Sequence, residues 1–104
     1  MIFKETFSIN GIKVRLTEER WRYIIFEHIE LEGCEDMIME TINNPDFLFK
    51  GHTDELLAVK NFTSLFFIIS VYKENDEEGF IITAYTKDSI ADFKRTREIL
   101  WKKN

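Results

Sequence analysis

Residues 56–86 read LLAVKNFTSLFFIISVYKENDEEGFIITAYT, and this stretch decides the fold class. It holds three runs rich in β-branched and aromatic residues, separated by turn residues, which indicates strands. The runs span 56–62, 65–73 and 80–86. The middle run is apolar almost throughout, which is typical of a central strand covered on both faces, so Phe67 and Ile69 are expected in the core. Because the connections are short, the strands should pair antiparallel as a meander.

The sequence before this stretch predicts a fourth strand and two helices. A short β-rich run at 46–50 precedes a turn at 51–54. Helical spacing of the stripe residues predicts a helix over 18–30, and these residues are Trp21, Ile24, Ile25, His28 and Ile29. Thr17 should be its N-cap, with acidic residues in its first turn. A second helix is expected over 35–43, which Pro45 and the residues before it end.

The N-terminal segment predicts a β-hairpin. Residues 2–9 and 12–16 alternate between apolar and polar side chains around Asn10 and Gly11. An Asn-Gly pair between two alternating runs is the strongest short signal for a hairpin, because both residues tolerate positive φ.

The C-terminal segment is less decided by its pattern. Ser89 and Asp92 fit a capping box for a short helix, and residues 96–103 fit either an extension of that helix or an edge strand. The whole order predicts one α+β domain over residues 1–104, with a β-hairpin, two helices and a four-stranded antiparallel meander. The helices should pack on one face of the sheet.

Composition places the chain among small folded intracellular domains. It has 104 residues, of which 44% are hydrophobic, and one cysteine, Cys34, so no disulfide can form within the chain. The first ten residues lack the apolar stretch of a signal peptide, and the longest strongly apolar run is too short to span a membrane. We therefore expect a cytoplasmic location and no membrane contact.

The net charge of −5 is unevenly distributed. Nine acidic residues against one lysine lie between Glu27 and Glu55, whereas residues 1–26 and 89–104 carry five bases each. If the two chain ends meet, their bases could share a surface for phosphate or for an acidic partner, and the alternative is ordinary solvated surface charge.

Several kinds of site are disfavoured by the absence of their motifs. Cys34, His28 and His52 have no metal-ligand spacing, so no metal is expected. The chain also lacks a glycine-rich phosphate loop and a dinucleotide fingerprint, so no cofactor is expected. His28 lies within the apolar stripe of the first helix, where it is either a core residue or a general acid or base.

Four short patterns together resemble a phage-type subgroup of the barnase–EndoU–colicin–RelE-like (BECR) nuclease-like superfamily. They are Val14 to Trp21 with His28 seven residues on, Ile42 to Asp46, Gly79 to Tyr85, and Leu100 to Lys102. The resemblance implies an α+β fold with helices before a four-stranded antiparallel sheet. It also implies RNA cleavage without a metal, or descent from proteins that cleaved RNA.

Residue by residue, the resemblance assigns His28 to the family's helix histidine and Arg20 to the arginine before it. Thr83 and Tyr85 correspond to the strand hydroxyl and aromatic residue. The pattern departs from the family where His28-Ile29-Glu30 replaces the usual His-Pro-Glu and where Arg22 replaces a frequent histidine.

Two functional hypotheses follow. The first is a non-catalytic or weakly catalytic module that binds a small protein partner, as in a toxin–antitoxin or phage-related operon. The second is a metal-independent endoribonuclease, with His28, Arg20, Thr83 and Tyr85 as catalytic groups. In that case the phosphate-binding residues would be Arg15, Arg22 and Arg97. RNA or a small protein is the expected partner in either case, and the sequence leaves self-association open.

Overall fold

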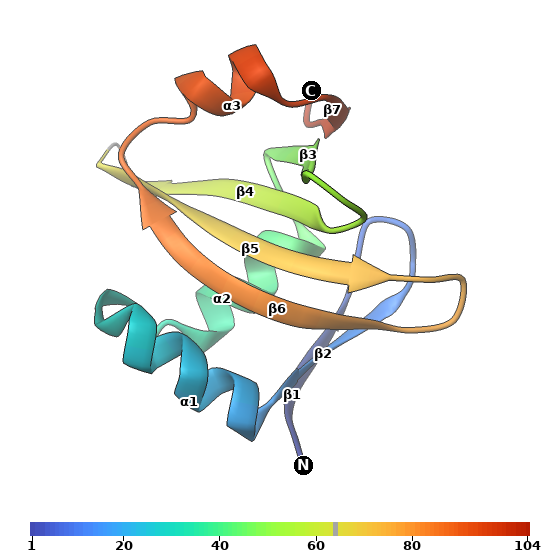
Figure 1. Ribbon diagram of the computed structural model, residues 1–104, viewed down its shortest axis with the longest axis vertical. Helices are drawn as coiled ribbons and strands as arrows, with labels where there is room; N and C mark the ends of the chain where they lie inside the picture. The colour runs from blue at the N-terminus through green and yellow to red at the C-terminus, as the bar shows by residue number, and fades with distance from the viewer. Residues whose placement is uncertain (64) are drawn as a thin grey trace.

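The computed structural model describes residues 1–63 and 65–104 as an α+β domain with one mixed sheet and three α-helices (Figure 1). The strands are β1 Ile2–Phe7, β2 Lys13–Thr17, β3 Phe47–Lys50, β4 Leu56–Thr63, β5 Phe66–Glu74, β6 Gly79–Lys87 and β7 Ile99–Lys102. The helices are α1 Glu18–Glu27, α2 Glu35–Asn43 and α3 Ala91–Thr96, with a 3₁₀ turn η1 at Ile29–Leu31. Ser64, which the sequence places in a turn, lies outside the described residues.

The four predicted β-rich runs form β3, β4, β5 and β6, and each pairs antiparallel with the next. β5 pairs along both of its edges, so it is the central strand of this group. Ile69 is fully buried, which confirms the prediction that it lies in the core. Phe67 is half-buried and packs against the core cluster without being enclosed by it.

The sheet extends beyond these four strands on both sides, which the sequence did not predict. Its order is β1-β2-β6-β5-β4-β3-β7, and β2 joins β6 through a short parallel pairing of Val14 with Gly79. Gly79 is needed at this junction, because a Cβ there would lie 2.8 Å from the Lys73 carbonyl oxygen and 3.1 Å from Val14 Cγ2. The hairpin is therefore part of one mixed seven-stranded sheet.

The predicted hairpin forms, but its connection is wider than a two-residue turn. The Ser8 N–H donates to the Ile12 carbonyl at 2.8 Å, which leaves Ile9, Asn10 and Gly11 as the loop. Among the described residues only glycines have positive φ, and Gly11 has φ +78°. Asn10 therefore does not take the left-handed conformation that the two-residue turn requires, and a three-residue loop with one left-handed glycine forms instead.

Both predicted helices form, and the first ends early. The Thr17 hydroxyl accepts a hydrogen bond from the Arg20 N–H at 3.1 Å, as its N-cap role predicts. The helix ends at Glu27 rather than at residue 30, because His28 has non-helical backbone angles and the chain continues into η1. The second helix has the predicted bounds, from Glu35 to Asn43.

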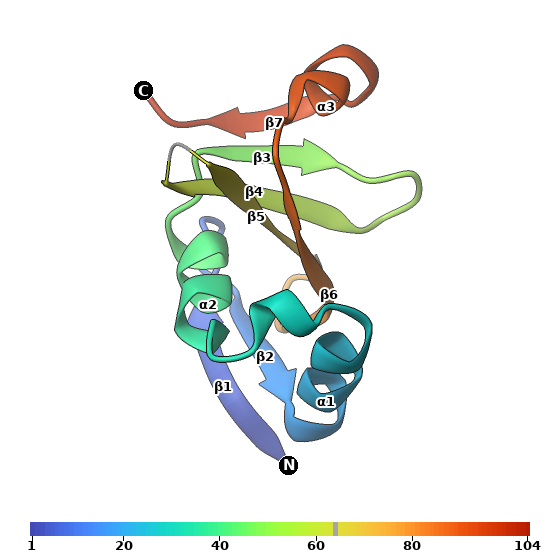
Figure 2. The same cartoon turned by 90° about the vertical axis from the view of Figure 1, so that its left-hand side faces the viewer.

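Helices cover both faces of the sheet, so the expectation of helices on one face is wrong for α3 (Figure 2). α1 and α2 pack on one face, where the buried residues include Ile24, Ile38, Ile42, Ile68 and Tyr72. α3 packs on the other face, which we call the α3 face, with Phe49, Val59, Ile69, Val71 and Phe93. Because both faces are covered, β5 has the nearly continuous apolar sequence seen above.

A β-bulge in β6 decides which side chains reach the α3 face. The pairing shifts from Thr83 opposite Val71 to Ile81 opposite Tyr72, so Ile82 has no partner across the strand pair. Simple alternation predicts Ile81 on the same face as Thr83 and Tyr85. The bulge makes that prediction wrong for Ile81, which is buried on the α1/α2 side, while Thr83 and Tyr85 share the α3 face.

The two ends of the chain lie at opposite edges of the sheet (Figures 1 and 2). The last segment forms the edge strand β7, not an extension of α3. Asp92 pairs with Lys87, so the predicted capping box does not form. The prediction that the bases of residues 1–26 and 89–104 share one surface is wrong, because the sheet order separates them.

Tyr72 carries a buried polar group without a partner on the α1/α2 side. Its side chain is fully buried, and its hydroxyl has no hydrogen-bond partner among the described residues. Burial raises the pKa of Tyr72, and the nearby Glu74 charge acts in the same direction. The phenol is therefore neutral, and its unpaired hydroxyl opposes folding.

We predict that Tyr72→Phe leaves the free energy of unfolding unchanged or raises it by up to about 1 kcal/mol, because the ring packing stays and the unpaired hydroxyl is removed. Chemical denaturation of the two proteins measures this. Tyr72→Ala is the control and should lose about 3–5 kcal/mol through the cavity. A loss of more than about 1 kcal/mol in Tyr72→Phe would show that the hydroxyl is hydrogen-bonded in solution.

Candidate functional site

His28 lies at the C-cap of α1, at the edge of the α3 face. Its side chain is 34% exposed, so it is neither a core residue nor fully solvated. Its ring centroid lies 6.0 Å from that of Tyr85, and its Nδ1 lies 3.7 Å from Glu30 Oε2. The structure therefore brings together two of the predicted catalytic residues, His28 and Tyr85.

Tyr85 stands on β6 with Thr83 two residues before it on the same face. The ring is half-buried, and burial raises the pKa of Tyr85. The positive charge of Arg97 acts against this shift and lowers the pKa, whereas the charge of Asp92 raises it. The phenol is thus neutral. Its ring lies beside His28 and packs against the cluster that contains Phe93, the residue whose ring lies under Arg97.

Arg97 follows α3 and is held by an aromatic ring and a histidine. Its guanidinium carbon lies 5.0 Å from the Phe93 ring centroid, and one of its nitrogens lies 3.2 Å from His52 Nε2. In the described part of the chain no carboxylate lies within ion-pair distance of Arg97. A half-buried arginine without a counter-ion is suited to bind an anion.

The loop from Gly51 to Glu55 fixes His52 beside Arg97. The Gly51 N–H donates to the Glu55 carbonyl at 2.9 Å, which closes the loop. The Thr53 hydroxyl donates to the Glu55 carboxylate at 2.6 Å, and this bond with those of nearby backbone amides lowers the pKa of Glu55 to about 2. The carboxylate is therefore ionised at neutral pH and keeps the loop closed.

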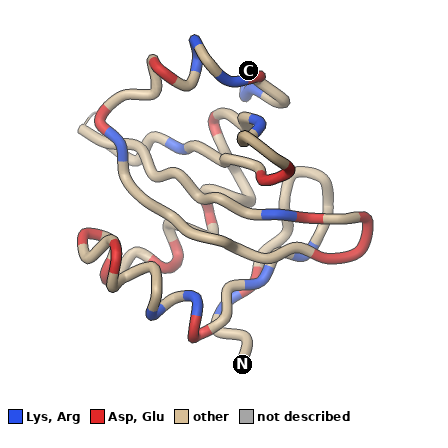
Figure 3. The backbone as a smooth tube through the Cα atoms, in the orientation of Figure 1, with Lys and Arg blue, Asp and Glu red and all other residues tan. Residues whose placement is uncertain are grey.

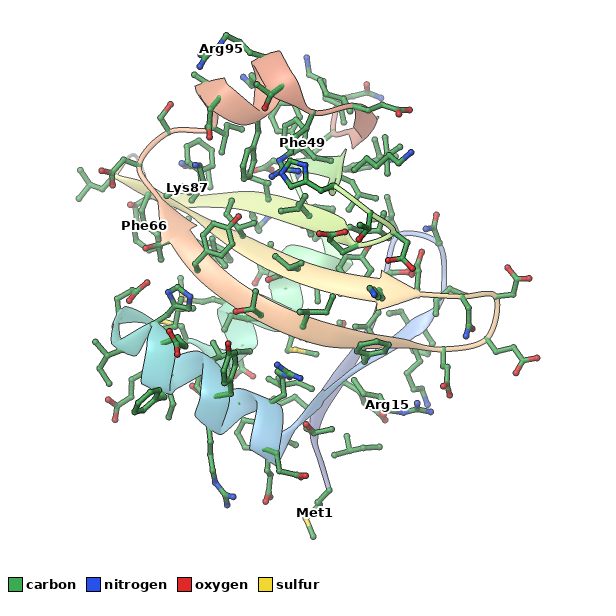
Figure 4. The ribbon with its side chains drawn as sticks, in the orientation of Figure 1. Met1, Arg15, Phe49, Phe66, Lys87 and Arg95 are labelled. Atoms are coloured by element: carbon green, nitrogen blue, oxygen red, sulfur yellow. The ribbon has the colours of Figure 1, made fainter. Side chains whose placement is uncertain are left out.

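The other predicted arginines do not reach this group. Arg20 begins α1 and stacks on Tyr23, and eight residues of helix, about 12 Å, separate it from His28. Arg15 pairs with Glu78 at 3.2 Å, and Arg22 pairs with Glu18 at 3.9 Å. Figure 4 labels Arg15 at the end of the molecule opposite α3. Of the three predicted phosphate ligands, only Arg97 lies near Tyr85.

A second feature, which the sequence patterns did not single out, lies on the outer face of α1. Tyr23, Phe26 and the following Ile29 are 50%, 85% and 67% exposed. The prediction of an inward stripe on α1 is confirmed for Ile24, which is buried, and for Trp21 and Ile25, which are half-buried. It is wrong for Ile29, which is exposed. Ile29 leaves the stripe because the helix ends at Glu27. Tyr23 and Phe26 are large apolar residues that lie outside the inward stripe of this amphipathic helix. Their position in the sequence pattern could therefore have identified them as exposed apolar residues.

In residues 1–63 and 65–104 no three His, Cys, Asp or Glu side chains are grouped so as to hold a metal ion. No helix in the same part of the chain is long and apolar enough to cross a membrane.

Comparison with known proteins gives no relative for this arrangement. No protein-family model, no curated protein and no solved structure matches the chain.

Proposed function

We propose that the chain is a protein-interaction module and that its partner covers the outer face of α1. The observation that carries this proposal is the exposure of Tyr23, Phe26 and Ile29 at three-residue intervals along α1 and η1. We call these three side chains the α1 patch. Large apolar side chains exposed together on one helix are typical of interaction sites on soluble proteins.

The fold gains little from the α1 patch. The contacts of α1 with the core come from the opposite side of the helix, where Ile24 is fully buried. Tyr23 contacts Arg20 through a cation–π interaction, in which the guanidinium carbon lies 5.2 Å from the centroid of the tyrosine ring. Covering such side chains contributes about 1.5–3 kcal/mol each when burial is complete, which is sufficient for an interface with a few dominant residues.

The scaffold is consistent with descent from the BECR superfamily. Two helices precede four consecutive antiparallel strands, as the sequence resemblance implies, and the resemblance remains the basis of that assignment. Arg20 is remote from His28, and Arg15 and Arg22 are paired with carboxylates. We propose that such a scaffold has kept its fold while binding a protein has become its main role.

We predict that Phe26→Ser weakens partner binding by about 30-fold or more, since truncating a dominant interface residue costs about 2 kcal/mol. The free energy of unfolding of the Phe26→Ser variant should differ from that of the wild type by less than about 0.5 kcal/mol, because the Phe26 side chain is exposed. The matched control is Phe80→Ser, on β6, which removes another exposed phenylalanine, 53% accessible.

The partner is first captured with the wild-type protein and both variants, and its affinity is then measured with purified components. A partner that binds the wild type and both variants equally would contradict the proposal.

Metal-independent cleavage of RNA is the second candidate, and the cluster of His28, Tyr85 and Arg97 favours it. His28 would take the proton from a ribose 2′-OH as the 2′ oxygen attacks phosphorus and the bond to the 5′ oxygen breaks. Arg97 would hold the negative charge on the phosphate, and His52 beside it would give the leaving oxygen its proton. Tyr85 and Thr83 would position the phosphate.

If this cluster is catalytic, the wild-type protein should cleave RNA in the presence of EDTA, and His28→Ala should reduce the rate by at least about 10²-fold. The melting temperature should stay nearly unchanged, because His28 is partly exposed and is at the end of its helix. Arg22→Ala, which removes a surface arginine distant from Tyr85, is the control. Loss of stability together with unchanged cleavage would assign His28 a structural role.

A further inference from the structure

A pocket lies next to the end of α1 and adjoins the His28–Tyr85–Arg97 cluster without containing any of its three residues. It has a volume of about 270 Å³ and is lined by Glu30, Leu31, Cys34, Phe66 and Thr86. Glu30 in its wall directly follows Ile29 of the α1 patch in the chain, so a bound segment that fills the pocket also reaches that end of the patch. Figure 4 labels Phe66 at the end of the sheet on the same side of the view as this end of α1.

The size and lining of the pocket suit one apolar side chain. Leu31 and Phe66 supply apolar walls, and the volume is below the range of about 300–1,000 Å³ that holds a cofactor or a drug-sized molecule. In protein–protein interfaces, the residues that contribute most of the affinity commonly insert into a pocket of the opposing protein. The protruding α1 patch and the adjacent pocket therefore form two halves of one docking surface.

The rim of this surface is negatively charged. Its acidic residues are Glu30, which lines the pocket, and the exposed Glu27 and Glu32, which are within three residues of Glu30 in the chain. In the described residues none of the three has a lysine or arginine within ion-pair distance. Glu30 contacts only His28 and the Thr86 hydroxyl, at 3.7 Å and 3.4 Å. Figure 3 shows acidic residues at the far end of α1, whereas acidic and basic residues are mixed near its start. The carboxylates are thus free to bind cations of a partner.

We infer that the partner presents an apolar-and-basic segment, with one apolar side chain in the pocket and a lysine or arginine on the Glu30 and Glu32 rim. This inference rests on the proposed function and specifies the chemistry of its partner. The apolar residues would cover the α1 patch, and the cations would decide which apolar segments bind.

Three synthetic helical peptides test the inference. The first carries leucines at i, i+4 and i+7 flanked by lysines, the second has glutamates in place of the lysines, and the third has serines in place of the leucines. Cys34 is the single cysteine and lines the pocket, so the rate at which a thiol reagent modifies it reports on occupancy. Binding is measured in parallel by calorimetry.

The lysine peptide should slow modification of Cys34 and bind at least about threefold more tightly than the glutamate peptide, because exposed ion pairs contribute about 0.2–1 kcal/mol each. The serine peptide should not protect Cys34. E30Q/E32Q should remove the preference for lysine, whereas D76N/E77Q, in the distant β5–β6 loop, should keep it.

The outcomes separate this inference from the proposed function. If the lysine and glutamate peptides protect Cys34 equally, and if Phe26→Ser removes this protection, the charge assignment is overturned. The α1 patch would then still be an interface. Absence of protection by any peptide at millimolar concentration would overturn the pocket, while the captured partner still tests the α1 patch. Self-association in sedimentation that itself protects Cys34 would identify a second copy as the occupant and overturn a separate partner.

Discussion

The burial of β5 on both faces is the constraint on which the rest of the structure depends. Ile68 and Tyr72 face α1 and α2, while Ile69 and Val71 face α3, and both edges of the strand are hydrogen-bonded. A strand with no polar face must be covered on each side, so it needs helices from two distant parts of the sequence. The N-terminal helices cover one side and the C-terminal helix covers the other, which explains why the two chain ends separate.

This arrangement produces two different surfaces. The bulge in β6 puts Thr83 and Tyr85 on the α3 face, where Arg97 lies over Phe93, while the early end of α1 places His28 beside Tyr85. On the outside of α1 the same early end turns Ile29 outward, next to Tyr23 and Phe26. One local event, the break of the helix at His28, therefore shapes both the histidine cluster and the apolar patch.

Elements set by local sequence could be predicted, and those set by long-range pairing could not. The four strands from 46 to 87, the Thr17 cap and the bounds of α2 follow from periodicity and capping. The parallel junction of Val14 with Gly79, the pairing of β7 with β3 and the bulge at Ile82 depend on contacts between distant segments. For the site, the short sequence patterns singled out His28 and Tyr85, which the fold makes neighbours, whereas the separation of Arg15 from Arg97 required the sheet order. His52 was not assigned a role, because its loop is brought to Arg97 only by the fold.

The free energy of unfolding of a triple variant, Y23S/F26S/I29S, tests most directly whether the α1 patch is spare surface rather than core. We predict a cooperative transition and a change of less than about 1 kcal/mol, because these side chains add little to the buried apolar area. A loss of more than about 3 kcal/mol would show that the three side chains support the fold itself, and it would contradict their assignment to a partner.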